Sequence, residues 1–305
     1  MARIEMIPNI SEGRDEAIIR HLVSAVRGVP GAAVLDTSWD PFHHRMVLTA
    51  VGDSSALYQA SIQLFEQAIA LIDMRRHRGE HPRVGAVDVL PFVPLEGTSM
   101  SECVALARRV GEDVADRFGV PVYLYEYAAR EPERRELPHL RKGGFEGLAE
   151  KMKLPRGRPD FGPDRPHPTA GVSIVGARGP LIAFNVNLGT DRLKIARTIA
   201  RAVRQSNGGL DHVRAIGVSL YGRGQVQVSM NLTDYRRTPL HRALERVRDE
   251  AQAHGVEVTG SEIVGLAPLD AFLDAAAHCL RLEASPRDKA LEERLRRLDV
   301  DPGTS

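Results

Sequence analysis

The apolar residues of the first hundred positions follow two different spacings. One set recurs at the helical period: Ile18, Ile19, Leu22, Val23 and Val26. Short apolar runs rich in β-branched residues predict strands at 4–7, 32–35, 46–51 and 86–93, and residues 54–74 predict a long helix. The first unit therefore has the order β-α-β-β-α-β, followed by a helix at 101–118 and a strand at 120–125.

The same order returns in the second half of the chain. Strands are predicted at 181–188, 213–220, 226–232 and 256–264, and helices at 192–203, 240–254 and 268–279. The two units also open alike, with Pro-Asn-Ile-Ser-Glu-Gly before one first helix and Asn-Val-Asn-Leu-Gly before the other. The repeat predicts an α+β fold of two ferredoxin-like subdomains that arose by duplication.

Each sheet is expected to be antiparallel, with its helices on one face. The subdomains are placed at residues 1–178 and 179–282, and residues 283–305 form a charged helical tail. The alternative is one doubly wound parallel sheet, which needs strict β-α alternation and conflicts with the adjacent strand pairs. Residues 131–168 are rich in Pro, Gly, Arg and Lys, and predict loops with short helical pieces that carry function.

Composition narrows the class of protein. The 305 residues are 43% hydrophobic and 27% charged, with a net charge of +1. This balance predicts a cytoplasmic globular protein and gives no indication of nucleic acid or membrane as a partner. The two cysteines, Cys103 and Cys279, lie in apolar helical patterns, and we expect both to be buried and reduced.

The densest polar stretch is the 75–83 segment, Arg-Arg-His-Arg-Gly-Glu-His-Pro-Arg, between a long helix and a buried strand. Gly79 and Pro82 restrict the backbone around His81, and histidine is the natural proton carrier near neutral pH. By its letters, His77 to His81 also matches an inverted zinc-protease motif. That motif requires a continuous helix, which Gly79 and Pro82 disfavour. A solvated charged loop is the remaining alternative.

Two other polar turns are candidates. Asp36 and Asp40, with His43, His44 and Arg45, are expected on the turn between two strands, where a carboxylate near His81 would orient the imidazole. The turn at 221–224 is typical of a plain hairpin and does not open a helix, as a phosphate loop would.

Taken together, the motifs resemble the glutamate formiminotransferase family over nearly the whole chain. The matching stretches are 8–14, 76–83, 85–88, 121–125, 159–163, 176–178, 183–188 and 227–232, which include Gly-Glu-His-Pro-Arg and Pro-Asp-Phe-Gly-Pro. The resemblance implies two subdomains with a folate-binding cleft between them, a homodimer, and His81 as the catalytic base. Animal members continue into a cyclodeaminase domain, whose activity we do not expect here because the chain stops at Ser305.

The resemblance also implies binding residues. The folate stretch corresponds to Gly162, Pro163, Asp164, Arg165, Pro166, His167, Pro168, Thr169, Ala170 and Gly171. Some members carry an acidic residue where this chain has Ser38, so Asp40 is taken to supply the catalytic carboxylate. Arginine suits carboxylates because its fork binds both oxygens, and the candidates for glutamate are Arg45, Arg76, Arg83 and Arg178.

The implied reaction transfers the formimino group of N-formimino-L-glutamate to tetrahydrofolate, giving 5-formiminotetrahydrofolate and L-glutamate, with no metal. Three alternatives stay open: a formyltransferase that uses N-formylglutamate, a non-catalytic folate-binding protein, and a ferredoxin-like nucleic-acid binder. The last would need aromatic residues on the sheet surface and a basic face, whereas aromatic residues make up only 5% of the chain.

Overall fold

A computed structural model of the chain describes residues 3–79, 82–220 and 222–300. The chain divides into two compact units, Met1–Gly179 and Pro180–Ser305. Each unit contains its own β-sheet and its own helices, so the protein is α+β with two separate sheets. The single continuous parallel sheet, the alternative considered from the sequence, is excluded.

The sheet of the first unit has seven strands. They are β1 (Ile4–Met6), β2 (Asn9–Ile10), β3 (Ala33–Asp40), β4 (Arg45–Gly52), β5 (Val87–Pro94), β6 (Val122–Glu126) and β7 (Ser173–Ala177). From one edge, β3 pairs with β4, β4 pairs with β1 and β2, and these two pair with β5. All of these pairs are antiparallel, whereas β7 pairs in parallel with both β5 and β6.

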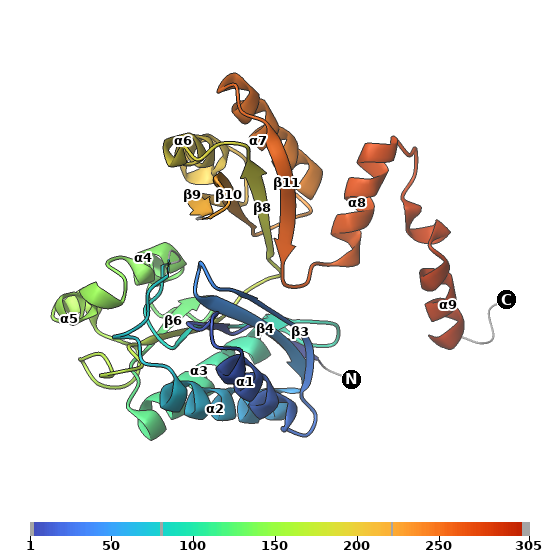
Figure 1. The fold of residues 1–305 in the computed structure, drawn as a ribbon. Coiled ribbons are helices and arrows are strands. Elements are labelled where there is room, and N and C mark those ends of the chain that lie inside the picture. Colours follow the sequence, from blue (N-terminus) through green and yellow to red (C-terminus); the bar gives the residue numbers. More distant parts are fainter. Residues whose placement is uncertain (1–2, 80–81, 221, 301–305) are drawn as a thin grey trace. The chain divides into compact units, whose positions relative to one another are not determined.

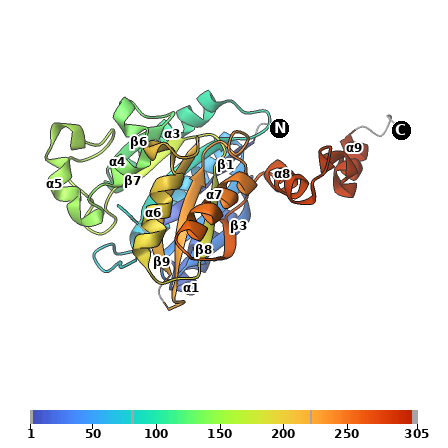
Figure 2. The ribbon, with the colours of Figure 1, turned by 90° about the horizontal axis from the view of Figure 1, so that it is seen from above.

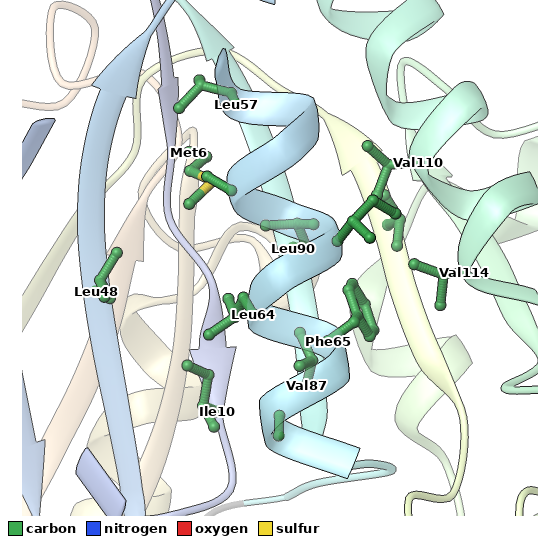
Figure 3. Close-up of a cluster of buried hydrophobic side chains, with 14 of the residues drawn as sticks. Met6, Ile10, Leu48, Leu57, Leu64, Phe65, Val87, Leu90, Val110 and Val114 are labelled. Atoms are coloured by element: carbon green, nitrogen blue, oxygen red, sulfur yellow. The ribbon is translucent and has the colours of Figure 1, made fainter. Parts of the chain in front are cut away.

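Three long helices cover one face of this sheet (Figure 1): α1 (Glu16–Arg27), α2 (Ser54–Leu71) and α3 (Met100–Phe118). Each begins at a polar cap, namely Asp15, Asp53 and the capping box of Ser99, whose side chains accept hydrogen bonds from the first free backbone N–H groups. Figure 3 shows Leu64 of α2 on the side of the helix toward Ile10 and Phe65 on the side toward Val114, in the largest core of the unit. The apolar residues that recur at the helical period are therefore the ones that pack against the sheet.

The opposite face of the first sheet departs from the prediction. The segment between β6 and β7 forms two short helices, α4 (Leu137–Arg141) and α5 (Leu148–Met152), and 3₁₀ turns at Pro132–Arg134, Phe145–Gly147 and Pro155–Gly157. Apolar residues of this segment pack on the face away from α1–α3, in a smaller core. The expected short helical pieces are confirmed, but the expectation of a purely antiparallel sheet covered on one face is wrong for this unit.

The second unit is simpler (Figures 1 and 2). Its strands are β8 (Ile182–Leu188), β9 (Val213–Leu220), β10 (Gln225–Leu232) and β11 (Val258–Val264), in the order β11-β8-β10-β9 with every pair antiparallel. Helices α6 (Leu193–Val203) and α7 (Leu240–Ala253) pack on one face of the sheet. A 3₁₀ turn, Gln205–Asn207, lies between α6 and β9.

The chain continues through α8 (Leu269–Leu280), a 3₁₀ turn at Pro286–Lys289 and α9 (Leu291–Val300). Cys103 is buried on α3 as expected, whereas Cys279 is exposed because α8 buries little of its own surface. Both thiols are free. In the described ranges, every helix is too short or too polar to cross a lipid bilayer.

Candidate functional site

The 75–83 segment lies in the first unit against the turn that joins β3 to β4, residues 41–44. His77 Nε2 donates a hydrogen bond to the backbone carbonyl of His44 at 2.7 Å, and His44 Nδ1 donates to the carbonyl of Arg78 at 3.0 Å. The two imidazole rings are stacked, with centroids 4.1 Å apart and planes 9° from parallel. The turn and the segment are therefore joined by a reciprocal histidine pair.

Gly79 lets the two backbones approach this closely. A Cβ at position 79 would lie 2.3 Å from the carbonyl oxygen of His43 and 2.9 Å from the His44 side chain. Any larger residue would push the turn away from the segment. Glu80 and His81, the general base expected from the sequence, lie outside the residues that the structure describes.

The imidazole of His77 is held neutral. It is 3% exposed, and burial lowers its pKa to about 4. Since Nε2 donates to the His44 carbonyl, Nδ1 accepts, and the Nε–H of Arg83 donates to it at 3.1 Å. The guanidinium of Arg83 also forms an ion pair with Glu146, 2.6 Å from Nη2 to Oε1. Arg83 thus ties the segment to the chain between α4 and α5.

A carboxylate that was absent from the sequence-based candidates anchors the other histidine. Glu12 is buried, and its Oε1 lies 3.2 Å from His44 Nε2. Burial alone would raise the pKa of Glu12, but hydrogen bonds from His44 and from the backbone N–H groups of residues 13–15 outweigh burial and lower the pKa to about 2. Glu12 is therefore a fixed negative charge at neutral pH.

A second buried network lies on the sheet face away from α1–α3. Asp88 of β5 forms an ion pair with Arg141 of α4 and accepts a hydrogen bond from the backbone N–H of Val84 at 2.8 Å. Arg45, at the start of β4, donates to the side chain of Asn9. Burial, and then the nearby charge of Arg141, lower the pKa of Arg45 to about 9. Positive charge is thus concentrated beside the histidine pair.

The two networks border one small cavity. It measures about 10 Å³ and is lined by Ile10, Ser11, His43, His44, Arg45, His77, Arg83 and Asp88. That volume is roughly the room for one water molecule. A larger hollow of about 650 Å³ lies between the end of α1 and the start of α2, but its lining includes none of the residues of the two networks. The described part of the network is therefore packed and preorganised.

Two aspartates differ from their expected position. The strand β3 extends to Asp40, so Asp36 and Asp40 lie in the strand and the turn shrinks to residues 41–44. The carboxylate of Asp40 accepts hydrogen bonds from the backbone N–H groups of Phe42 and His43, both at 2.7 Å. The expectation that Asp36, Asp40 and Arg45 lie on the turn is therefore wrong, because Arg45 begins β4, and Asp40 caps the turn instead.

The predicted folate stretch, residues 162–171, is hydrogen-bonded to residues on either side of the 75–83 segment. The carbonyl of Thr169 accepts from the backbone N–H of Met74 at 2.8 Å, and that of Ala170 accepts from Ala86 at 2.9 Å. The ring of His167 accepts from the N–H of Ala170 at 3.0 Å, which closes the stretch on itself. The end near Gly171 is buried, whereas residues 162–165 are exposed. One end of the stretch is thus anchored and the other faces solvent.

The other two arginine candidates, Arg76 and Arg178, lie in different surroundings. Arg76 is exposed, and its Nε lies 3.9 Å from a carboxylate oxygen of Asp73. Arg178 lies just after β7, where Nη1 donates to the carbonyl of Gly179 at 2.9 Å. Burial raises the pKa of Tyr125 to about 12, and the charge of Arg178 opposes that rise. Only Arg45 and Arg83 among the four border the histidine network.

The zinc alternative finds no support in the described ranges. Residues 77–79 are not helical, and His81, the second histidine of the motif, lies outside the described residues. No group of three or more His, Cys, Asp and Glu in the described residues is arranged to hold a metal ion.

Sequence reasoning missed Glu12, Asp88, Arg141 and Glu146 as members of these networks. Glu12 and Asp88 fall inside motifs that were noticed for their resemblance, but nothing in their local spacing indicates burial. Arg141 and Glu146 come from a stretch without clear periodicity, 53 and 63 residues from their partners. Only the tertiary fold reveals such long-range pairs.

Comparison with known proteins adds the family. The formiminotransferase domain, N-terminal subdomain, matches residues 3–178, and the formiminotransferase domain matches residues 183–298. A glutamate formimidoyltransferase of Streptococcus pyogenes serotype M1 is 47% identical over 284 residues, 93% of this chain and 95% of that protein. Another, from Thermoplasma acidophilum, is 45% identical over 297 residues, 97% of this chain and 98% of its own.

A bifunctional relative matches over part of its length. The formimidoyltransferase-cyclodeaminase of Rattus norvegicus is 43% identical over 280 residues, 90% of this chain and 52% of that protein. The two domain matches follow one another along nearly the whole chain, and the near full-length relatives exceed 40% identity. This chain belongs to the formiminotransferase family.

Proposed function

We propose that this protein is a glutamate formimidoyltransferase, which transfers the formimino group of N-formimino-L-glutamate to tetrahydrofolate and releases 5-formiminotetrahydrofolate and L-glutamate. The observation that carries the proposal is the 47% and 45% identity, over more than nine-tenths of each chain, to two proteins named for this activity. Tetrahydrofolate is a co-substrate, and the reaction requires no metal.

The reaction is an exchange of amines at an amidine carbon. A ring nitrogen of tetrahydrofolate attacks the formimino carbon, a tetrahedral intermediate forms, and the bond to the glutamate nitrogen breaks. The attacking nitrogen loses a proton and the departing nitrogen gains one, so one imidazole serves both steps. Such general acid–base catalysis contributes about 10²–10⁴-fold, and alignment of the two substrates contributes a larger share.

We assign the proton transfer to His81. Its neighbours in sequence support the assignment, since His77 is held by the His44 carbonyl and Gly79 lies against His43. The chain is thus anchored four and two residues before His81 in the sequence. His77 itself is a poorer candidate, because both of its ring nitrogens already have partners.

We assign the role of the site's carboxylate to Glu12. Asp40 contributes by holding the shape of the 41–44 turn. N-formiminoglutamate carries a basic amidine that is cationic at neutral pH, whereas the amide of N-formylglutamate is neutral. A carboxylate whose pKa is lowered to about 2 remains ionised and favours the cation. This argument supports the formimino donor over the formyl donor.

For binding, we propose that residues 162–171 contact the folate and that Arg45 and Arg83 attract the glutamate carboxylates, with Arg178 as a further candidate. The hydrogen bonds of Thr169 to Met74 and of Ala170 to Ala86, which flank the 75–83 segment, support the first assignment. We also propose that the two units are a duplicated ferredoxin-like pair, with boundaries near 178 and 282, and that the protein is a homodimer. The β-α-β-β-α-β order of the second unit supports the duplication.

The test is turnover of formiminoglutamate with and without tetrahydrofolate, with N-formylglutamate as competing donor. We expect folate-dependent release of glutamate and a clear preference for the formimino donor in kcat/KM. His81→Ala should lower kcat by roughly 10²–10⁴-fold with folate binding retained. His254→Ala, at the exposed end of α7, is the control. Folate binding without turnover would support a binding protein, and faster formyl transfer would support a formyltransferase.

A further inference from the structure

The sheet of the second unit has one apolar and one amide-rich face. Phe184, Val186 and Leu188 of β8, together with Val226 and Val228 of β10, pack in the core with α6 and α7. Because successive side chains of a strand point to opposite faces, the residues between them lie on the other face. These include Asn185 and Asn187 on β8 and Gln227 on β10, all within stretches noted in the sequence analysis and not used by the proposed reaction.

The pairing register brings these amides to one carboxylate. Gln227 lies directly opposite Asn187, and Glu262 of β11 lies directly opposite Asn185. Gln227 Nε2 donates to Asn187 Oδ1 at 2.9 Å and to Glu262 Oε1 at 2.8 Å. Asn185 Nδ2 donates to the same Glu262 oxygen at 3.1 Å. Four side chains from three strands therefore form one network.

The network leaves a buried acceptor open. Gln227 is 2% exposed, and its Oε1 has no hydrogen-bond partner in the described part of the chain. The amide cannot be reversed to relieve this, because its oxygen would then face the Glu262 carboxylate and the Asn187 oxygen. A buried acceptor without a partner is unfavourable and calls for a donor from a ligand or a water molecule. Glu262 is exposed, and the hydrogen bonds it receives from described residues end on Oε1 alone.

The hydrogen-bonding groups of the network that remain available to a ligand indicate its chemical class. Gln227 Oε1 and Glu262 Oε2 are acceptors, and the side-chain N–H groups of Asn187 are donors. A ligand carboxylate offers only acceptors and would meet the charge of Glu262. A formamidinium offers only donors and would leave the Asn187 N–H groups unmatched. The aminopyrimidinone edge of a pterin offers two adjacent N–H donors beside a carbonyl, which matches both kinds of position.

We propose that Glu262 and Gln227, with Asn185 and Asn187, form the subsite that binds the pyrimidine edge of the pterin ring. The proposal rests on the proposed function, since that function supplies the folate. Glu262 accepts the N–H donors in a charge-assisted pair, and the amides fix the orientation of the carboxylate.

The test measures binding of two probes by titration calorimetry. One is 5-formyltetrahydrofolate, which contains the pterin, and the other is p-aminobenzoylglutamate, which lacks it. Glu262→Gln keeps the shape and removes the charge, and we expect it to weaken binding of the first probe at least about tenfold. Binding of the second probe and the KM for formiminoglutamate should stay within about twofold, as a lost charge-assisted contact to the pterin alone requires.

Two further variants complete the test. Gln227→Met fills the same space without a polar group and should also weaken only the pterin-containing probe, while Glu257→Gln removes an exposed carboxylate just before β11 and should change neither. Unaltered binding of 5-formyltetrahydrofolate by both Glu262→Gln and Gln227→Met would overturn the subsite, as would a selective rise in the KM for formiminoglutamate. A wild-type protein that binds neither folate probe and shows no turnover would instead refute the proposed function.

Discussion

At the scale of single residues, the histidine network makes stability depend on pH. His77 has a pKa of about 4 when folded, against 6.5 as its ordinary value. The unfolded chain therefore binds a proton on His77 between pH 6.5 and 4 that the folded chain does not. Protonation below pH 6.5 therefore favours the unfolded chain, and the free energy of unfolding falls by up to about 3 kcal/mol as the pH drops toward 4.

Glu12 affects stability in a lower pH range. Its folded pKa is about 2, against an ordinary value of 4.5, so its contribution is present above pH 4.5 and is lost as the pH falls toward 2. We expect His77→Asn to flatten the difference in unfolding free energy between pH 7 and 4, and Glu12→Gln to flatten it between pH 4.5 and 2. Urea titrations at a series of pH values measure both. A His77→Asn curve parallel to that of the wild type would contradict the buried neutral histidine.

These residues also mark the limit of sequence reasoning. From the sequence, Gly79 and Pro82 predicted a restricted backbone, because glycine and proline affect the conformation of the chain locally. The structure shows why a glycine stands at position 79: its backbone lies against His43. Glu12 gave no such signal. Its role depends on His44, which lies 32 residues away and reaches it only after β4 pairs with β2. Partners that are distant in sequence cannot be paired from spacing alone.

At the scale of elements, local periodicity predicted most helices and strands to within a few residues. Helices α1 and α7 have clear apolar stripes and caps or breaks at their ends. The strand β7 was missed because it is a five-residue run, directly after a segment without periodicity, that is buried on both faces. Its parallel partners are also far away in sequence, so β7 is not marked by the short turn motif that links the two strands of a hairpin.

The ion pair between Asp88 and Arg141 joins α4 to β5, and we predict that it holds the β6–β7 connection on the sheet. Arg141→Met would remove the ion-pair partner of the buried Asp88 carboxylate, at a cost of about 3–5 kcal/mol. Arg158→Met is the matched control, because its pair with Asp164 is exposed and should contribute less than about 1 kcal/mol. Thermal and urea unfolding of the two variants measure the difference, and equal stabilities would refute it.

Gly85 determines how the end of the 162–171 stretch lies against β5. A Cβ at this position would lie 1.9 Å from the carbonyl oxygen of Val172 and 2.8 Å from that of Ala170. Gly85→Ala should therefore displace Ala170 and Gly171, destabilise the protein by about 1–3 kcal/mol, and raise the KM for tetrahydrofolate. Gly147→Ala, where a Cβ would meet no atom within 4 Å, serves as control. An unchanged KM in a destabilised Gly85→Ala protein would separate this stretch from folate binding.

At the scale of the whole molecule, the repeated element order predicted an α+β protein, and the two sheets confirm that class. The order could not predict how far the first sheet extends. Adding β7 and β6 requires a helical crossover and a second core on the opposite face, built from residues that look like loop in the sequence. Topology beyond the repeat therefore depends on contacts between segments with no periodic signal of their own.

The last prediction concerns how independently the units fold. Each has its own hydrophobic core, formed entirely from its own residues. A fragment of residues 180–305 and one of residues 1–179 should therefore each unfold in a single cooperative transition, followed by circular dichroism. The informative comparison is a fragment of residues 1–165, which is only slightly shorter but lacks β7. Since β7 lies between β5 and β6 in the sheet, its loss removes every backbone pairing that joins β6 to β5. This fragment should lose cooperativity, whereas a sharp transition would show that β7 and β6 are accessory to the core of the first unit.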